Sequence, residues 1–278
     1  MGTLRHQLQP MACPKSTCTA TSTGRAGWVV DADDGACFIA NPVRPVCVAS
    51  PGPTLPEPTP RQTPAMYLPT HFEETRPAVL HALMQRHPLG LLITLGPDGA
   101  PVANPIPMHL QARRGALGTL VGHVARANPV WQAAGQQVLV VFQGPDGYIS
   151  PNGYASKREH GKVVPTWNYA TVQARGPLVA LEDAAATHAL VSMLTTHHET
   201  RQARPWAVGD APDDYIAGML RAIVCVEIPL TALVGKYKLS QNRSVADRAG
   251  VVANLQADAE PAAHDLAAWM QSPAGAQP

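Results

Sequence analysis

The amino-acid composition changes sharply at Met66, and this change limits which part of the chain can form a folded core. Residues 1–65 contain 10 of the 28 prolines and include the run PGPTLPEPTP at residues 51–60. They show neither helical nor alternating apolar spacing, and proline-rich chain favours extended conformations that bury little surface. We therefore expect a disordered extension over residues 1–65, a folded domain over 66–257, and a weak terminal helix or frayed tail over 258–278.

Four of the five cysteines lie in the proline-rich extension, at Cys13, Cys18, Cys37 and Cys47. Cys13 and Cys18 could begin a zinc site with His6, but no second close pair of cysteines follows them, so we predict no metal site. Two interpretations of the extension stay open. Either it is a disordered tail, or translation begins at Met66 and the upstream residues are not made.

The charges of the chain nearly cancel. It carries 21 Lys and Arg against 20 Asp and Glu, and residues 66–278 alone carry 16 of each kind. A domain this close to neutral has no broad attraction for nucleic acid or for an anionic membrane. The longest apolar runs, such as VLVVF at residues 138–142, are too short to cross a bilayer, and residues 1–10 lack the apolar stretch of a signal peptide. We therefore expect a cytoplasmic protein.

From Met66 onward, short apolar runs alternate with turn residues, which indicates an α+β fold built on an antiparallel barrel. Thr75 and Pro77 predict the start of a helix that Gly90 ends, and its apolar face carries Val79, Leu80, Leu83 and Met84. Strands are predicted at residues 91–95, 101–110, 116–124, 137–143, 165–175 with a continuation at 179–181, 222–229 and 231–239. Turns are predicted at 96–99 and 144–147 and a polar loop at 156–161, with helical segments at 128–134, 182–200, 213–220 and 244–255.

The segment GHVARANPVW at residues 122–131 carries the densest set of chemically useful side chains. A strand ends there, and His123, Arg126 and Asn128 precede a helical turn that opens with Pro129. Free N–H groups at a helix start favour an anion, and an arginine adds a bidentate phosphate partner. The alternative is a purely structural connection in which Asn128 caps the helical turn.

Two further segments could contact a planar or charged ligand. VVPTWNY at residues 163–169 places Trp167 and Tyr169 on one strand face and Asn168 on the other, so it forms either a wall for a ring or a set of core aromatics. GKYKLSQNR at residues 235–243 places Lys236 and Lys238 on one strand face before a polar strand-to-helix boundary. This second cluster suits a phosphate or a flavin edge, or else a helix cap with a solvated basic face.

Other motifs point to structure rather than chemistry. His197, His198 and Glu199 are adjacent on a predicted helix and do not face one point, so we expect a buried hydrogen-bonding pair at a helix end. Cys225 lies in an apolar strand with no visible base and is expected to be an inert core thiol. The chain contains no G-x-G-x-x-G after a strand, no Walker loop and no H-E-x-x-H, which disfavours nucleotide folds and zinc proteases.

Taken together and in order, these segments resemble the PaiB family of FMN-binding negative transcriptional regulators, within the FMN-binding split-barrel superfamily. The resemblance covers nearly all of residues 66–257 and none of residues 1–65. It rests on MYLPTHF at residues 66–72, on residues 122–131, on VFQGP at 141–145, YISP at 148–151, VPTWNY at 164–169 and KYKLSQN at 236–242.

The resemblance implies a split β-barrel with flanking helices, a homodimer, and FMN bound where the two barrels meet; some barrels of this kind bind deazaflavin or haem instead. It implies phosphate contacts from His123, Arg126 and Asn128, ring contacts from Lys236, Lys238 and Gln241, and Trp167 and Asn168 flanking the site. His109 completes the set of side chains predicted to bind the cofactor.

Two functions follow from this resemblance. The first is a repressor of transcription, although the neutral charge gives direct DNA binding no support, since residues 243–255 offer only Arg243 and Arg248 against Asp247. The second is a flavin-dependent oxidoreductase of the pyridoxamine-phosphate-oxidase type, with His109 or His123 as the possible base.

Overall fold

The computed structural model describes residues 66–272, so the predicted extension with its four cysteines, and residues 273–278, lie outside the described residues. The helices in the described part are α1 (Pro77–Arg86), α2 (Ser156–His160), α3 (Ala184–Glu199), α4 (Asp213–Arg221), α5 (Val245–Gln256) and α6 (Pro261–Gln271). Short 3-10 turns lie at η1 (Thr70–Phe72), η2 (Pro129–Ala133), η3 (Pro151–Gly153) and η4 (Val208–Asp210). No helix within 66–272 combines the length and the apolar character that a membrane span requires.

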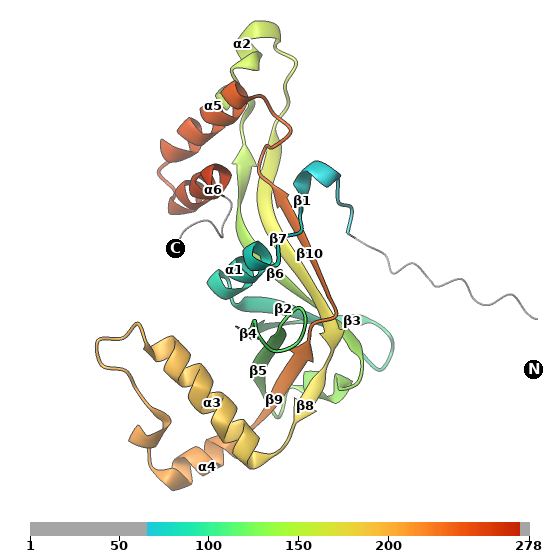
Figure 1. The fold of residues 1–278 in the computed structure, drawn as a ribbon, viewed down its shortest axis with the longest axis vertical. Helices are drawn as coiled ribbons and strands as arrows, with labels where there is room; N and C mark the ends of the chain where they lie inside the picture. The colour runs from blue at the N-terminus through green and yellow to red at the C-terminus, as the bar shows by residue number, and fades with distance from the viewer. Residues whose placement is uncertain (1–65, 273–278) are drawn as a thin grey trace, which may run out of the picture. The chain divides into compact units, whose positions relative to one another are not determined.

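The strands of the described part form two antiparallel sheets, which confirms the predicted α+β class (Figure 1). The six-stranded sheet has the order β1 (Glu73–Glu74), β10 (Ala232–Lys238), β7 (Thr166–Pro177), β6 (Gln137–Ile149), β2 (Leu89–Leu95) and β3 (Pro101–Pro107). The four-stranded sheet has the order β4 (His109–Gln111), β5 (Thr119–Ala125), β9 (Ile223–Pro229) and β8 (Val179–Leu181).

Three strands continue directly into a strand of the other sheet. β3 passes into β4 through Met108, β7 into β8 through Leu178, and β9 into β10 through residues 230–231. In all three the first strand ends in a proline, which lacks the N–H needed to extend the ladder, and a buried apolar residue follows. The two sheets therefore close around one core as a split barrel. The predicted single strands at 101–110 and 165–181 are each divided between the two sheets.

Two glycines allow the sheets to touch where the bent strands cross. A Cβ atom added to Gly176 would lie 2.1 Å from the carbonyl oxygen of Pro229, and one added to Gly122 would lie 2.8 Å from that of Pro107. Only glycine permits backbones to approach this closely. A side chain at either position would separate the two sheets at their shared corner.

Helix α1 forms largely as its apolar spacing predicts, with Val79, Leu80, Leu83 and Met84 all buried. Its start differs in one respect, because Arg76 rather than Thr75 occupies the N-cap position and no side chain caps it. Gly90 does not end the helix. It lies inside β2, where an added Cβ would approach Val140 Cγ1 to 2.6 Å, so this glycine allows a close contact with β6.

The predicted turn at residues 144–147 is a β-bulge inside the long strand β6. Gln143 pairs with Thr171 and Asp146 with Tyr169, so one extra residue is inserted on β6. Pro145 cannot donate to a ladder, and the bulge places it where the ladder is already interrupted. Strand β6 can therefore continue to Ile149 despite a turn-like sequence. The turn predicted at 96–99 is confirmed, with Gly99 at φ +78°.

The C-terminal part of the described chain packs more tightly than its sequence suggests. Helix α6 buries Leu266, Ala267, Trp269 and Met270, so it belongs to the core and is not a frayed tail. In α5, Asp247 is buried and accepts hydrogen bonds from the backbone N–H and the hydroxyl of Ser156. Ser156 lies in α2, a short helix at the position of the expected polar loop.

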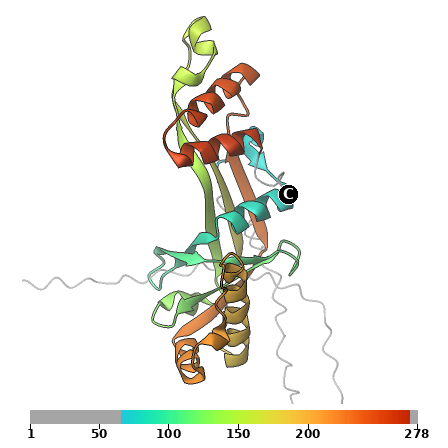
Figure 2. The same cartoon turned by 90° about the vertical axis from the view of Figure 1, so that its left-hand side faces the viewer.

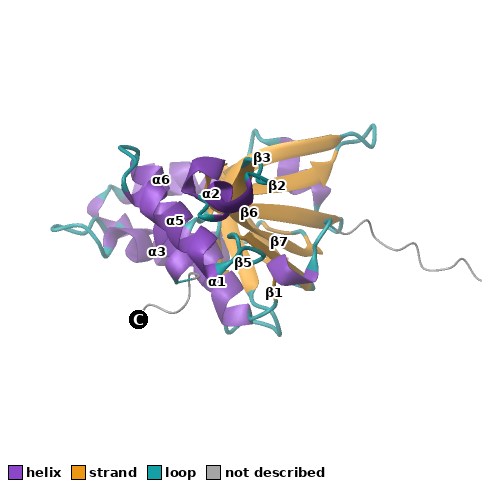
Figure 3. Cartoon of the chain, turned by 90° about the horizontal axis from the view of Figure 1, so that it is seen from above, coloured by secondary structure: helices purple, strands orange, loops and turns teal. Residues whose placement is uncertain are grey.

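The two faces of the six-stranded sheet differ in what covers them. Figures 1, 2 and 3 show α1, α5 and α6 on the same side of the long strands, and the four-stranded sheet closes the rest of that inner face. The residues that point the other way are partly or fully exposed along β2, at Leu89, Leu91, Ile93 and Leu95. We call this second side the open face, because no helix within 66–272 covers β2, β3 or β6 there.

Candidate functional site

The nine side chains predicted to bind a cofactor lie in three places. His109 and His123 lie on the four-stranded sheet, and Arg126 and Asn128 follow β5. Trp167, Asn168, Lys236, Lys238 and Gln241 lie where β7 pairs with β10 or just after it. No hydrogen bond or ring contact within residues 66–272 joins the first two groups to the third. In a single chain, the predicted site residues therefore lie in separate places.

The guanidinium of Arg126 forms three hydrogen bonds within the chain. It donates to the carbonyl oxygens of Arg221 (3.0 Å) and Ile223 (3.1 Å) and to a carboxylate oxygen of Glu182 (3.2 Å). Glu182 precedes α3 and Arg221 ends α4, so Arg126 binds both ends of the segment that contains these helices. We call residues 182–222 the arm. With its donors used in this way, Arg126 has no pair of free N–H groups to offer a phosphate in this structure.

Asn128 adopts the structural role that its position also allowed. Its side-chain oxygen accepts a hydrogen bond from the backbone N–H of Val130, which makes it the N-cap of η2, and its amide nitrogen donates to Asn104. The two asparagines lie at the rim of a hollow of about 430 Å³ between the β2–β3 turn and η2. No charged residue lines that hollow, so it could hold a neutral ring but offers no cation to a phosphate.

The two histidines lie on the side of the four-stranded sheet that faces the arm. His123 stands opposite Cys225 in the β5–β9 pairing, and partial burial lowers its pKa. His109 is half-buried and its ring centroid lies 4.5 Å from that of His197 in α3. Partial burial lowers the pKa of His109, and the positive charges of His197 and His198 lower it further. Both rings therefore favour the neutral form.

Lysines and aromatic rings gather where β10 pairs with β7. The ammonium of Lys236 donates to the carbonyl oxygen of Tyr67 (2.8 Å) and lies 5.3 Å and 5.5 Å from the ring centroids of Tyr67 and Tyr169. The ammonium of Lys238 donates to the Thr166 hydroxyl and to the carbonyl oxygen of Trp167. We call this group the lysine–aromatic patch, and its members are Tyr67, Tyr148, Trp167, Tyr169, Lys236 and Lys238.

The lysine–aromatic patch carries positive charge that no carboxylate pairs with directly. Burial lowers the pKa of Lys238, and the charges of Lys236 and Arg243 lower it further. Glu73 stands opposite Lys236 in the β1–β10 pairing, but neither lysine forms an ion pair among residues 66–272. A bound anion would offset this repulsion, and cations beside aromatic rings suit a ligand that combines a planar ring with an anion.

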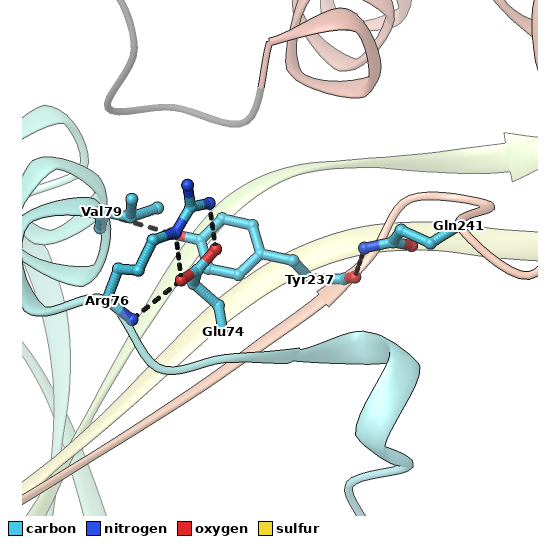
Figure 4. Close-up of polar contacts among 5 residues, drawn as sticks. All are labelled: Glu74, Arg76, Val79, Tyr237 and Gln241. Atoms are coloured by element: carbon cyan, nitrogen blue, oxygen red, sulfur yellow. Dashed lines mark hydrogen bonds and ion pairs between the residues drawn. The ribbon is translucent and has the colours of Figure 1, made fainter.

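Asn168 and Gln241 support the patch from behind instead of facing a ligand. Asn168 is buried and exchanges hydrogen bonds with the hydroxyl of Ser240, at 3.0 Å and 3.3 Å. Ser240 has φ 62°, a strained value for a residue other than glycine. Gln241 accepts a hydrogen bond from the backbone N–H of Leu239 and donates to the carbonyl oxygen of Tyr237, as Figure 4 shows for the second contact. These contacts hold the chain end that follows Lys238.

The sequence did not single out three residues of this region. Tyr67 and Tyr148 are exposed aromatic residues of the patch, and Ser240 has the strained backbone. The signal for Tyr67 was available, because MYLPTHF was recognised as an unusual segment, but its contact with Lys236 spans 169 positions of sequence. Local spacing cannot predict a contact at that separation.

The remaining reactive groups have structural explanations. Cys225 is buried, as predicted, and burial raises the pKa of its thiol. His197 and His198 were expected to be buried but are exposed in the last turn of α3. In the part of the chain that the structure describes, no three His, Cys, Asp or Glu side chains form a group that could hold a metal ion.

The lysine–aromatic patch is compatible with FMN. The exposed rings of Trp167 and Tyr148 offer a surface against which an isoalloxazine ring could pack. The ammonium of Lys238 offers a donor to a phosphate, and Lys236, which is buried, adds its positive charge. The hollow beside Asn128 could accept part of a neutral ring. Neither place alone offers both an enclosed ring pocket and a cation.

Comparison with known proteins identifies the family. A family model described as "Putative FMN-binding domain" matches residues 66–232. The protease synthase and sporulation protein PAI 2 of Bacillus subtilis is 32% identical over 208 residues, covering 74% of this chain and 97% of that protein. An uncharacterised protein of Aspergillus fumigatus is 32% identical over 237 residues, covering 69% of this chain and 91% of that protein.

A solved structure of an FAD- and haem-binding protein from Mycobacterium smegmatis superposes with a TM-score of 0.42 and 20% identity, covering 60% of this chain and 73% of that one. A similarity of this size carries no functional information. The sequence matches do identify the family, because they extend over more than half of the chain. The chain therefore belongs to the PaiB-type family of FMN-binding proteins, whose cofactor is FMN.

Proposed function

We propose that this chain is an FMN-binding regulator of transcription that works as a homodimer with the cofactor at the dimer interface. The observation that supports this most is the open face of the six-stranded sheet. It is apolar on one half and carries the lysine–aromatic patch on the other. The first half suits a second protein surface, and the second half suits a flavin phosphate and ring.

The apolar half of the open face is continuous across three strands. Leu91 of β2 pairs with Pro105 of β3 on one side and with Val141 of β6 on the other. The full set comprises Leu89, Leu91, Ile93 and Leu95, Pro101, Ala103, Pro105 and Pro107, and Leu139 and Val141. An exposed apolar surface spread over three strands favours association, and a second copy of the same face would cover it symmetrically.

The open face brings only the lysine–aromatic patch to a dimer interface, because the hollow beside Asn128 lies on the inner side of β2 and β3, where Thr94 and Asn104 line it. That hollow lacks a cation, and the patch around Lys238 lacks an enclosed ring pocket. When bound, FMN would bring redox chemistry, while Lys238 would hold its phosphate, Lys236 would add its positive charge and Trp167 would pack beside its ring.

The regulatory part of the proposal is supported by the likeness to the sporulation protein PAI 2, and the structure favours an indirect route to DNA. Helix α5 was the best candidate for a DNA-reading element. Its basic residues are engaged, since Arg243 lies 4.8 Å over the ring of Tyr154 and Arg248 donates to the carbonyl oxygen of Met270. With Asp247 buried between them, α5 presents no basic recognition face.

The oxidoreductase alternative has less support from the described residues. Its two candidate bases, His109 and His123, lie on the four-stranded sheet beside the arm and not in the lysine–aromatic patch. Turnover of a nicotinamide cofactor by purified protein, lost on Trp167→Ala, would favour the enzyme over the regulator.

The test of FMN binding is the absorption spectrum and the thermal stability of purified protein with and without FMN. At 100-fold its dissociation constant, FMN should add about 2.7 kcal/mol to the free energy of unfolding. Lys238→Gln should weaken binding about tenfold, as expected for the loss of one charge-assisted contact, and Lys162→Gln, an exposed lysine outside the patch, should leave it unchanged. A protein that is colourless and gains no stability from FMN would refute the proposal.

A further inference from the structure

The arm is attached to the barrel by a small contact that is separate from the main core. Its buried part consists of Thr187 and Leu190 on α3 and of Val121 and Cys225 on the four-stranded sheet, with Leu181, Met193 and Leu194 partly buried around them. Helix α4 has no buried residue in the chain described. Segments with so few buried apolar contacts open at lower free energy than the core does.

Two polar contacts hold the arm at its opposite ends. At the base, Arg126 binds Glu182 before α3 and the carbonyl oxygen of Arg221 at the end of α4. At the far end, in the last turn of α3, His197 packs edge to face against His109 of β4 with ring centroids 4.5 Å apart. The arm is thus fixed at its base by hydrogen bonds and at its far end by a contact between two imidazoles.

The charged groups around this imidazole pair are mostly cationic. On α3, His198 lies 5.2 Å from His197, and the carboxylate of Glu199 is engaged by the backbone N–H of Trp206. On the barrel side, His109 borders a shallow hollow with the neutral Gln85 and Gln111 and with Arg113 and Arg114. The carboxylate of Glu227 is paired with Arg114, and the last turn of α1 adds Arg86. Protonated imidazoles would find no free carboxylate among these neighbours.

We propose that the arm is a pH-operated cover of the four-stranded sheet, closed while His109 is neutral and opened about its Arg126-bound base when His109 becomes protonated beside His197. Two positive rings at this separation repel each other. Opening uncovers Cys225 and the sheet surface around Val121, which the closed arm buries. This inference rests on the chain's own residues and is independent of FMN binding.

The pH range follows from His109. Its pKa is lowered in the closed state, by burial first and by the neighbouring histidines second, and returns to the ordinary value of about 6.5 when the arm opens. The open state therefore binds more protons below this pH. Closure of the arm is fully favoured above about pH 6.5. It weakens as the pH falls from there towards the lowered pKa of His109.

The experiment measures access to Cys225 in the full-length protein. Labelling by N-ethylmaleimide is quantified at the Cys225 peptide by mass spectrometry, at about pH 7.5 and about pH 5.5. Each rate is divided by the rate of a His109→Gln variant at the same pH, which cancels the pH dependence of thiol chemistry. We expect the ratio to rise at the lower pH, because the open state binds more protons there than the closed state does.

Control variants separate the imidazole pair from general effects of acid. His188→Gln removes an exposed histidine of the same helix whose ring contacts Ser192, and it should behave as the unchanged protein does. If His109→Gln does not fold, His197→Gln takes its place. A ratio that stays near one, an equal effect of His188→Gln, or hydrogen exchange in β6 and β7 that rises together with exchange in α3 would each overturn the proposal.

Discussion

Leu91 and Leu92 are neighbours in β2 and chemically identical, yet the structure gives them opposite surroundings. Leu92 is fully buried, and its cross-strand neighbour Val140 is buried beside it. Leu91 is 39% exposed, and its cross-strand neighbours are Pro105 and Val141 on the open face. The two faces of the sheet are similarly apolar at this point, so the side chains themselves do not decide which one is the core.

The difference lies in what covers each face. α1, α6 and the four-stranded sheet pack against the inner face, and in the part of the chain described no helix packs against β2, β3 and β6 on the open face. A strand that is apolar on both sides is typical of one that is buried on both sides. This is why we propose that a second copy of the chain completes the burial of β2.

The largest expected effect separates the two leucines directly. Leu92→Ala should lower the free energy of unfolding by about 2–5 kcal/mol, because it leaves a cavity in a fully packed core. Leu91→Ala is the matched control and should cost less than about 1 kcal/mol in a monomer. Urea unfolding of both variants measures the difference, and equal losses would contradict the assignment of inner and open faces.

A charge on the open face tests whether a second copy covers it. Leu91→Asp should weaken self-association by at least about 2 kcal/mol, roughly thirtyfold, because a carboxylate would be buried in the interface. Light scattering after size exclusion measures the oligomeric state. Thr231→Asp is the control, since Thr231 is exposed and lies in the β9–β10 connection away from the apolar half. A monomeric unchanged protein would refute the proposed dimer.

The inner face also contains buried polar side chains, of which Asn168 is one. Asn168→Leu should lower the free energy of unfolding by about 1–3 kcal/mol, because the Ser240 hydroxyl would lose its partner inside the protein. The same change should weaken FMN binding if Asn168 positions the chain after Lys238. Combining it with Ser240→Gly, which relieves the strained backbone, should recover part of the stability. Full additivity of the two changes would argue against their coupling.

The smallest effect is expected at the rim of the inner face, where Figure 4 shows the Arg76–Glu74 pair beside Tyr237. The Arg76 guanidinium lowers the pKa of Glu74, so the pair stabilises the fold above the ordinary carboxyl pKa of about 4.3 and loses its effect as the pH falls below it. Because Arg76 is largely exposed, Arg76→Gln should lower the stability only slightly at neutral pH and not at all near pH 2. Thermal unfolding at both pH values measures this, and a loss that persists in acid would show that packing dominates.

Local sequence patterns predicted the elements whose cause is itself local. The helical spacing of Val79, Leu80 and Leu83 predicted α1, and Gly96–Gly99 predicted its turn. The cap role of Asn128 was one of its two interpretations, and Cys225 was predicted to be a core thiol. In each of these, neighbours within a few residues set the backbone or the burial, so spacing and residue type suffice.

Contacts between distant segments explain the features that local sequence patterns did not predict. Gly144 and Pro145 look like a turn, but pairing with β7 turns them into a bulge in a continuous strand. Asp247 looks like a surface residue of α5, but Ser156 of α2 supplies its buried hydrogen bonds. The phosphate role of Arg126 stays a prediction, and in this structure the two ends of the arm take up its donors. Each partner lies far along the chain and cannot be read from local spacing.

The sequence by itself determined the change of character at Met66, the α+β class, the order of most elements and, through its unusual segments, the family. Only the tertiary structure decided that Leu91 is open while Leu92 is buried, that Arg126 holds the arm, and that Lys236 meets Tyr67 to form the lysine–aromatic patch. The physical reason is that propensity and periodicity act over a few residues. Burial and hydrogen-bond partners depend on segments that the fold brings together from far along the chain.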